Sequence, residues 1–168
     1  IARMLPVFVL SEYALPTVAA IGGLTAFFAA TIATCQYDLK RVWAYSTISQ
    51  LGYMFLGVGV LSTVGGVFHL FTHAFFKALL FLTAGSVMHA MAGQLDLRRI
   101  SGLRHKMPVT CVLMLIGCLS LAGVPFIAAG FYSKDMIIAD AIINGMHEHS
   151  NLFIALAVLA IITAAMTA

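Results

Sequence analysis

Charged residues are scarce in this sequence. Only 9% of its 168 residues are Asp, Glu, Lys or Arg, whereas 62% are hydrophobic. Soluble domains carry about 25% charged residues, so this composition excludes an ordinary soluble domain. It predicts an integral membrane protein whose surroundings include a lipid bilayer.

The sequence also lacks the common catalytic motifs. It contains no GxGxxG, no P-loop, no cysteine pattern for an iron–sulfur cluster and no pair of carboxylates within an apolar run. Its three cysteines, Cys35, Cys111 and Cys118, have no CxxC or zinc-type spacing and are interpreted as packing residues. We therefore expect neither a redox cofactor nor a metal in this chain. The net charge of +3 comes from loops, so no nucleic-acid partner is expected.

No signal peptide is expected either, because no basic segment or small-residue cleavage site precedes the first apolar run. The chain begins at Ile1 without a methionine and stops at Ala168 inside an apolar run. We expect a fragment of a longer protein with several membrane spans.

The most informative stretch is the apolar run from Val64 to Met91, which as a helix is about 42 Å long and can cross a bilayer. On a helical wheel, His69, Thr72, His73 and Lys77 share one face. A lysine near the middle of a span costs about 2.5–3.5 kcal/mol, and such residues mark ion pathways. Three titratable groups about one turn apart predict a proton relay.

The spacing of His69 and His73 is also that of a pair of metal ligands. No third ligand and no HExxH glutamate accompany them, so the sequence favours the relay over a metal site.

Two other spans come before this run. The span from Leu15 to Cys35 carries small residues suited to close helix packing. Asp38 is expected to cap the next helix, which runs from about Val42 to Leu61. That helix has an unusually polar face, which indicates either hydrogen bonding between helices or a water-lined wall. The residues on this face are Ser46, Ser49, Gln50 and Tyr53.

The polar loops predict the topology. Residues 37–41 and 93–107 are separated by two spans and together hold six Lys and Arg, whereas residues 11–16 and 144–150 hold none. The positive-inside rule places the two basic loops on the cytoplasmic or matrix side. His147, Glu148 and His149 are interpreted as solvated loop residues on the opposite side.

The segment from Pro108 to Ile143 is too long for one span and too short for two. Gly123, Pro125 and Gly130 predict one discontinuous helix, broken between about residues 121 and 133. Lys134 and Asp135 follow the break, and broken helices of this kind mark ion sites in transporters. The alternative is that Lys134 lies at the far interface and extends its amine to water. A last span begins at Asn151.

Three blocks of sequence, residues 38–53, 69–81 and 130–138, resemble the largest antiporter-like subunit of respiratory complex I, the proton-pumping NADH:quinone oxidoreductase. The resemblance covers essentially the whole chain. It implies an all-α, polytopic transmembrane helix bundle with two inverted repeats, each containing a discontinuous helix. Residues 1–12 would end the first repeat, and residues 15–168 would form a truncated second repeat.

The resemblance also implies roles for individual residues. His69, His73 and Lys77 match the family's central hydrophilic axis, and Lys134 matches the lysine of the second broken helix. Supporting positions are Thr72, Asp135, Ser49 and Gln50. The partners would be other membrane subunits of complex I, and those subunits would bind NADH, flavin, iron–sulfur clusters and quinone. The implied location is the bacterial cytoplasmic membrane, with the mitochondrial inner membrane as the other possibility.

Two alternatives remain at this point. Subunits of multi-subunit cation/proton antiporters and of membrane-bound hydrogenases share this fold. A purely structural bundle is the third interpretation, and it is disfavoured because two unused lysines within the membrane would cost about 5–7 kcal/mol.

Overall fold

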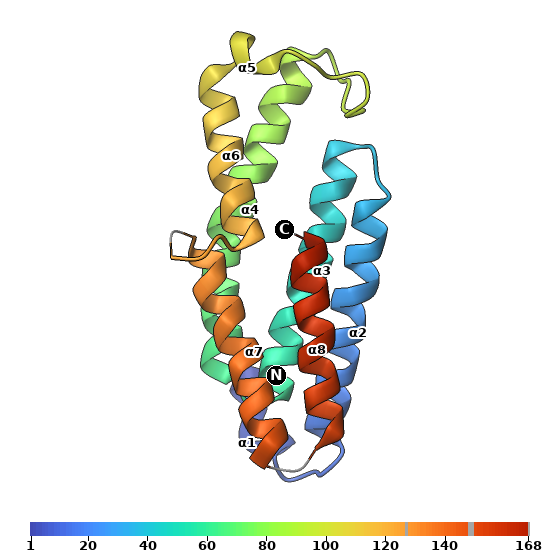
Figure 1. Ribbon diagram of the computed structural model, residues 1–168, viewed down its shortest axis with the longest axis vertical. Helices are drawn as coiled ribbons and strands as arrows, with labels where there is room; N and C mark the ends of the chain where they lie inside the picture. Colours follow the sequence, from blue (N-terminus) through green and yellow to red (C-terminus); the bar gives the residue numbers. More distant parts are fainter. Residues whose placement is uncertain (127, 148–149, 168) are drawn as a thin grey trace.

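The computed structural model describes residues 1–126, 128–147 and 150–167. In this part of the chain the regular elements are all helices, which form the elongated bundle of Figure 1. A 3₁₀ turn, η1 (Ala2–Met4), and the short α1 (Leu5–Phe8) come before the long helices. The other helices are α2 (Ala14–Thr34), α3 (Leu39–Gly59), α4 (Thr63–Ala90), α5 (Leu103–Lys106), α6 (Pro108–Ala122), α7 (Ala129–His147) and α8 (Asn151–Thr167).

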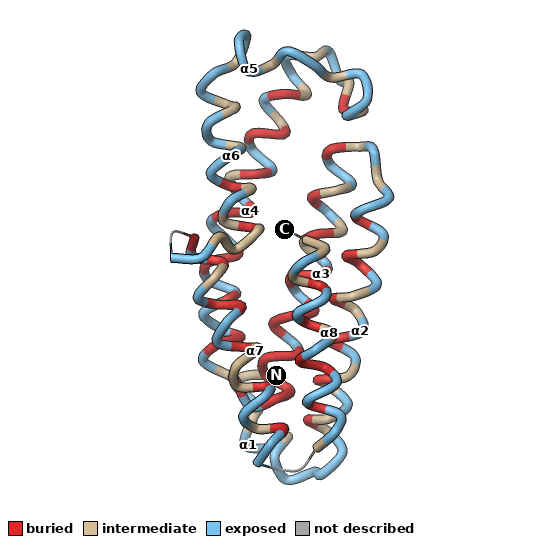
Figure 2. Tube along the Cα trace, in the orientation of Figure 1, coloured by how far each residue is buried: buried red, intermediate tan, exposed pale blue. Residues whose placement is uncertain are grey.

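Two of the described helices, α2 and α4, are long and apolar enough to cross a bilayer. Helix α3 has the same 21-residue length as α2 but is less apolar, because a row of its side chains is polar. Figure 2 shows buried stretches alternating with exposed ones along each long helix.

Helices α2 and α3 pack backbone against backbone. A methyl group in place of the Gly52 hydrogen would lie 2.8 Å from the Cα of Ala26 and 2.7 Å from the carbonyl oxygen of Gly22. Small residues at such a contact let two helices approach closely enough for extensive van der Waals contact. The packing role predicted for the small residues of this span is confirmed.

The discontinuous helix is confirmed. Helix α6 ends at Ala122 and is capped by Gly123, which has a positive φ of +75°. The Leu119 carbonyl accepts from the backbone N–H groups of Gly123 and Val124. This is a helix C-terminus closed by a left-handed glycine. Helix α7 resumes at Ala129, and the two halves follow one another along α4 (Figure 1).

The end of α7 differs from the prediction. We expected a loop from residue 144 to 150, but α7 continues through His147. Asn144 donates from its side chain to the Val60 carbonyl, 2.6 Å away, which ties this last turn to the end of α3. Glu148 and His149 lie outside the described residues.

The two basic loops meet at one end of the bundle. Asp38 and Asp96 form an isolated antiparallel bridge, in which the Leu39 N–H donates to the Leu95 carbonyl and the Leu97 N–H to the Tyr37 carbonyl. Asp38 also caps α3, since its side chain accepts from the backbone N–H groups of Lys40 and Arg41. The two loops therefore lie on the same side, as predicted from the number of spans between them.

An exposed ion pair orders the second of these loops. Arg98 donates from Nε and Nη2 to the two carboxylate oxygens of Asp96, at 3.0 and 2.8 Å, and its guanidinium stacks on the Tyr37 ring. The side-chain hydrogen bond from Arg98 lowers the pKa of Asp96 to about 2. Charged side chains therefore pair with one another in this loop, in contrast to the membrane-spanning part.

Candidate functional site

Helix α4 turns its polar face inward and its apolar face outward. His69, Thr72, His73 and Lys77 are all buried, with at most 8% of their surface exposed. The opposite face carries large exposed apolar side chains, namely Leu70, Phe71, Phe75 and Leu82. This distribution is the reverse of a soluble protein and suits a helix surrounded by lipid on one side and protein on the other.

His69 is held between α3 and α7. Its ring is fully buried, with Nε2 2.9 Å from Gln50 Oε1 on α3 and Nδ1 2.8 Å from Ser133 Oγ on α7. Thr72 lies one turn further along α4, and its hydroxyl is 3.2 Å from the His69 carbonyl and 3.3 Å from Ser133 Oγ. One imidazole thus connects three helices by hydrogen bonds.

His73 lies between His69 and Lys77 without bonding to either. Its ring centroid is 6.1 Å from that of His69 and 5.3 Å from that of Phe76, which meets it edge-on. Within the residues that the structure describes, its Nε2 is buried and has no hydrogen-bond partner, and the same holds for Ser46 Oγ on the facing helix. Because no hydrogen bond joins His73 to His69 or Lys77 among the described residues, a proton cannot pass directly from one of these side chains to the next.

Lys77 is buried against Trp43. Its Nζ donates to the Trp43 backbone carbonyl at 3.2 Å and lies 5.6 Å from the centroid of the indole ring. An ammonium group over an indole is a favourable cation–π contact. In the described part of the chain, the ion pairs are those of Asp96 with Arg98 and Arg99. No carboxylate there lies within ion-pair distance of Lys77.

Lys134 lies just after the break, on α7. Only 4% of its surface is exposed, and its Nζ donates to the Leu121 carbonyl at 2.7 Å. That carbonyl belongs to the last turn of α6, whose carbonyls have no partner within their own helix. The amine therefore satisfies the end of the first half-helix, and the alternative in which it extends to water at the interface does not describe this geometry.

The other predicted residues, Gln50, Ser49 and Asp135, do not all face His69 and Lys77. Gln50 contacts His69, whereas the neighbouring Ser49 points to the other side of α3 and donates to the Ala26 carbonyl on α2 at 2.8 Å. Asp135 is exposed, so it faces away from Lys134 and the α4 row. The structure brings together His69, His73, Lys77, Thr72, Gln50 and Lys134.

A comparison with known protein families shows which family this chain belongs to. Residues 1–167 match the model described as NADH:quinone oxidoreductase/Mrp antiporter, transmembrane. The chain belongs to this family. It is thus a membrane protein, and the all-α transmembrane bundle predicted from the sequence is confirmed.

One curated relative is similar over most of this chain. The chain is 54% identical over 138 residues to NADH-ubiquinone oxidoreductase chain 5 of Arabidopsis thaliana, and the match covers 82% of this chain and 20% of that protein. The chain therefore spans about a fifth of the length of this relative.

Two solved structures share the fold. One is the membrane-bound sulfane sulfur reductase, an archaeal respiratory membrane complex, with a TM-score of 0.81 and 31% identity over 99% of this chain and 34% of that one. The other is the Mrp complex of Dietzia sp. DQ12-45-1b, with a TM-score of 0.74 and 34% identity over 87% of this chain and 16% of that one.

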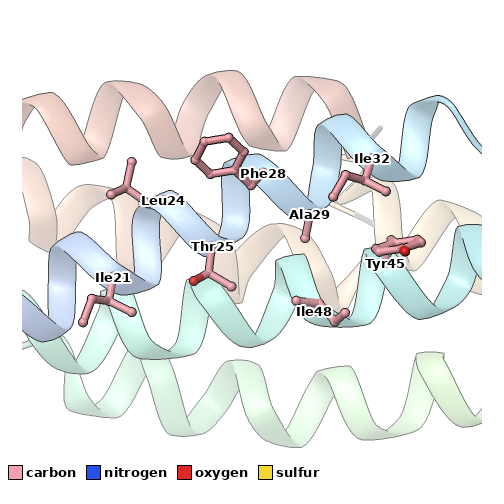
Figure 3. Close-up of a pocket in the computed structure, with 8 residues that line it drawn as sticks. All are labelled: Ile21, Leu24, Thr25, Phe28, Ala29, Ile32, Tyr45 and Ile48. Atoms are coloured by element: carbon pink, nitrogen blue, oxygen red, sulfur yellow. The ribbon is translucent and has the colours of Figure 1, made fainter.

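The outer surface of this family member carries a groove unrelated to the polar row. It has a volume of about 400 Å³ and lies between α2 and α3, lined by apolar side chains with Thr25 and Tyr45 among them (Figure 3). None of the titratable residues of α4 or α7 lines it. The groove is therefore separate from the buried polar row inside the bundle.

Two residues of the site, Ser133 and Trp43, were not predicted from the sequence. Ser133 was part of the Gly130–Ile138 block, but its hydroxyl was not recognised as a contact of His69. Trp43 is the second such residue, since it is buried and contacts Lys77. Neither has a periodicity signal, because each contact joins helices that are distant in sequence.

His69 and His73 show why a metal site is not supported here. Both nitrogens of His69 already engage Gln50 and Ser133. In the described ranges, no three His, Cys, Asp or Glu side chains gather as a metal would need.

Proposed function

We propose that this chain is part of a proton-translocating membrane subunit of NADH:quinone oxidoreductase. The observation that carries the proposal is the buried row His69, His73 and Lys77 on α4, connected through Ser133 to the helix break and Lys134. Burying ammonium groups without an anionic partner costs free energy, and residues of this kind within membranes serve ion pathways.

In this proposal Lys77 exchanges protons with His73 and His69 through intervening water. His69 and Lys77 are about 12 Å apart along the helix axis, which is too far for direct transfer. Lys134 continues the path on the other half-helix. The redox reaction takes place in other subunits, which bind NADH, flavin, iron–sulfur clusters and quinone.

The basic loops set the orientation of the path. With Arg98, Arg104 and Lys106 on the cytoplasmic or matrix side, the Lys77 end of the row faces that side. A cysteine introduced at Ser101 should be labelled from that side only. Labelling from the periplasmic or intermembrane side would reverse the orientation.

The alternative is a subunit of a multi-subunit cation/proton antiporter. The family description includes Mrp antiporters, and the Mrp complex shares this fold. Identity favours complex I, at 54% against 34%. Sodium efflux without NADH oxidation, measured with the full-length chain in its own complex, would favour the antiporter.

The test is to replace Lys77 in the full-length chain within the intact complex. Alanine removes the titratable group, and arginine keeps the charge but does not release its proton, since its pKa is above about 12. We expect both variants to assemble and to lose proton uptake into vesicles relative to NADH oxidation. His73→Ala should show a milder loss, because water can bridge a missing member of the row.

Normal pumping in Lys77→Arg would contradict the relay. It would leave Lys77 as a structural cation that binds the Trp43 carbonyl and ring.

A further inference from the structure

Ser133 occupies a special position in the bundle. It is fully buried on the first turns of α7, between the helix break and Lys134. Its hydroxyl is 2.8 Å from His69 Nδ1 and 3.3 Å from the hydroxyl of Thr72. It also lies 3.3 and 3.4 Å from the carbonyl oxygens of Ala129 and Gly130 in its own helix.

The partners of His69 determine the direction of this hydrogen bond. Gln50 presents Oε1, which only accepts, so His69 Nε2 carries a hydrogen and donates. In the neutral ring Nδ1 has no hydrogen, and it accepts from the Ser133 hydroxyl. When the ring holds a second proton, Nδ1 donates, and Ser133 Oγ has to accept.

A hydroxyl has one hydrogen, which turns to the best available acceptor. Once Nδ1 donates, the hydrogen of Ser133 has the carbonyl oxygens of Ala129 and Gly130 within reach. The relay supplies the added proton and positive charge of His69, and Ser133 itself neither gains nor loses a proton. The same hydroxyl therefore has two bonding states, one for each charge state of the imidazole.

We propose that Ser133 is a positioning residue that couples the protonation of His69 to the break between α6 and α7. This inference rests on the proposed relay function of the α4 row. Ser133 supplies a donor to the neutral imidazole and an acceptor to the imidazolium. In the second state its hydrogen bonds to the first turn of α7.

The contacts around that first turn show how the change reaches Lys134. Gly130 packs against the Ser120 carbonyl at the end of α6, so close that a Cβ at this position would overlap the oxygen. Lys134, the next residue after Ser133, donates to the Leu121 carbonyl across the break. When the Ser133 hydrogen is directed to the Ala129 or Gly130 carbonyl instead of to His69, it acts on the turn that holds both contacts.

Other groups near His69 contribute to any pH dependence. His73 faces it from α4, with ring centroids 6.1 Å apart, and Tyr53 faces it from α3 at 6.2 Å. Lys134 approaches from α7, one residue beyond Ser133. The test therefore needs a readout that belongs to Ser133 and His69 together.

The first experiment measures the pH profile of proton pumping with Ser133→Ala in the full-length chain, within the intact complex in vesicles. We expect about a tenfold loss of pumping per NADH oxidised, because a buried bond to a charged group is lost. We also expect the acid limb of the profile to move to lower pH. Ser133→Cys keeps the size of the side chain but is a weak donor, and it should show the same change if the alanine variant assembles poorly.

Ser133→Thr retains the hydroxyl and should restore the native pH profile. Thr83→Val is a matched control, since Thr83 is a buried hydroxyl that bonds to the Leu79 and Leu80 carbonyls of its own helix, α4. It should leave the profile in place. A loss of pumping in Ser133→Ala and Ser133→Cys with an unshifted profile would overturn the switch and assign Ser133 a structural role.

A second experiment is independent of pumping. Hydrogen exchange of the backbone amides at residues 129–134, in the assembled complex, should depend on pH in the native protein. It should lose that dependence in Ser133→Ala and in His69→Gln alike. Unchanged dependence in Ser133→Ala would overturn the inference even if Lys77→Ala abolishes pumping, whereas normal pumping in Lys77→Arg would overturn the proposed function and leave this exchange result standing.

Discussion

Helix α3 has two faces that meet their neighbours in opposite ways. Toward α2 it offers Gly52 and Gly59, which allow backbone contact without any titratable group. Toward α4 it offers Gln50, which contacts His69, and Trp43, whose carbonyl and ring hold Lys77. One helix thus takes part in a tight apolar contact and in a polar row.

The difference shows how a membrane protein accommodates buried charge. The α2–α3 contact is held by van der Waals packing of small residues, which lipid cannot replace because it depends on shape. The polar row contributes little to packing, and each of its hydrogen bonds depends on a helix held in place elsewhere. We infer that the close α2–α3 contact provides the rigid support against which the polar row of the proposed relay is positioned.

The largest effect is expected where the backbones touch. In Gly52→Leu the new side chain meets the Ala26 backbone, which cannot move as a flexible side chain would, so overpacking should cost about 3 kcal/mol or more. We expect loss of assembled complex on native gels. Gly85→Leu is the control, since a Cβ at Gly85 has no neighbour within 4 Å. Equal assembly of the two variants would contradict the supporting role of the α2–α3 contact.

A smaller effect is expected at the break, which belongs to the polar side of the comparison. Gly130→Ala places a methyl group against the Ser120 carbonyl, so the two half-helices must move apart at a cost of about 1–3 kcal/mol. Because Lys134 bonds across the same break, we expect pumping per assembled complex to fall more than assembly does. A loss of assembly without a loss of pumping per complex would show that the break is only a packing feature. Gly85→Ala is the matched control.

Adjacent residues on α3 separate the two faces. Ser49→Ala removes the bond to the Ala26 carbonyl and should cost about 1 kcal/mol of stability, measured as a lower thermal midpoint. Gln50→Leu removes the acceptor of His69 Nε2 and should reduce pumping far more than Ser49→Ala does. A larger pumping defect in Ser49→Ala would mean that the relay extends to the α2 side of α3.

The smallest effect is expected from the exposed ion pair of the basic loops. Arg98 lowers the pKa of Asp96 to about 2, so the pair contributes above the unfolded pKa of about 3.9 and is lost as the pH falls through 2. Between pH 5 and 8 the contribution is constant. Since exposed ion pairs contribute little, Asp96→Asn should shift the thermal midpoint by less than about 1 °C in that range. A larger shift would assign the loop contact a structural importance comparable to the small-residue contact.

Much of the fold could be predicted because its causes are local. The apolar run around Lys77 predicted a long helix with His69, Thr72 and His73 on one face, and that face is buried. Asp38 was predicted to cap α3, and it does. The break between α6 and α7 followed from the length of the apolar segment and from Gly123. The end of α7 could not be predicted, because Asn144 is held in the helix by the Val60 carbonyl, which is distant in sequence.

The sequence by itself thus determined which side chains of α4 share its buried face, since that depends only on the 3.6-residue period. The tertiary structure alone decided which face meets which neighbour. Ser49 and Gln50 are adjacent, and the sequence predicts the same supporting role for both. In the structure the Ser49 hydroxyl bonds to the Ala26 carbonyl on α2, whereas the Gln50 side chain contacts His69 on α4. Ser133 entered the site for the same reason, because the helix break brings the start of α7 against the middle of α4.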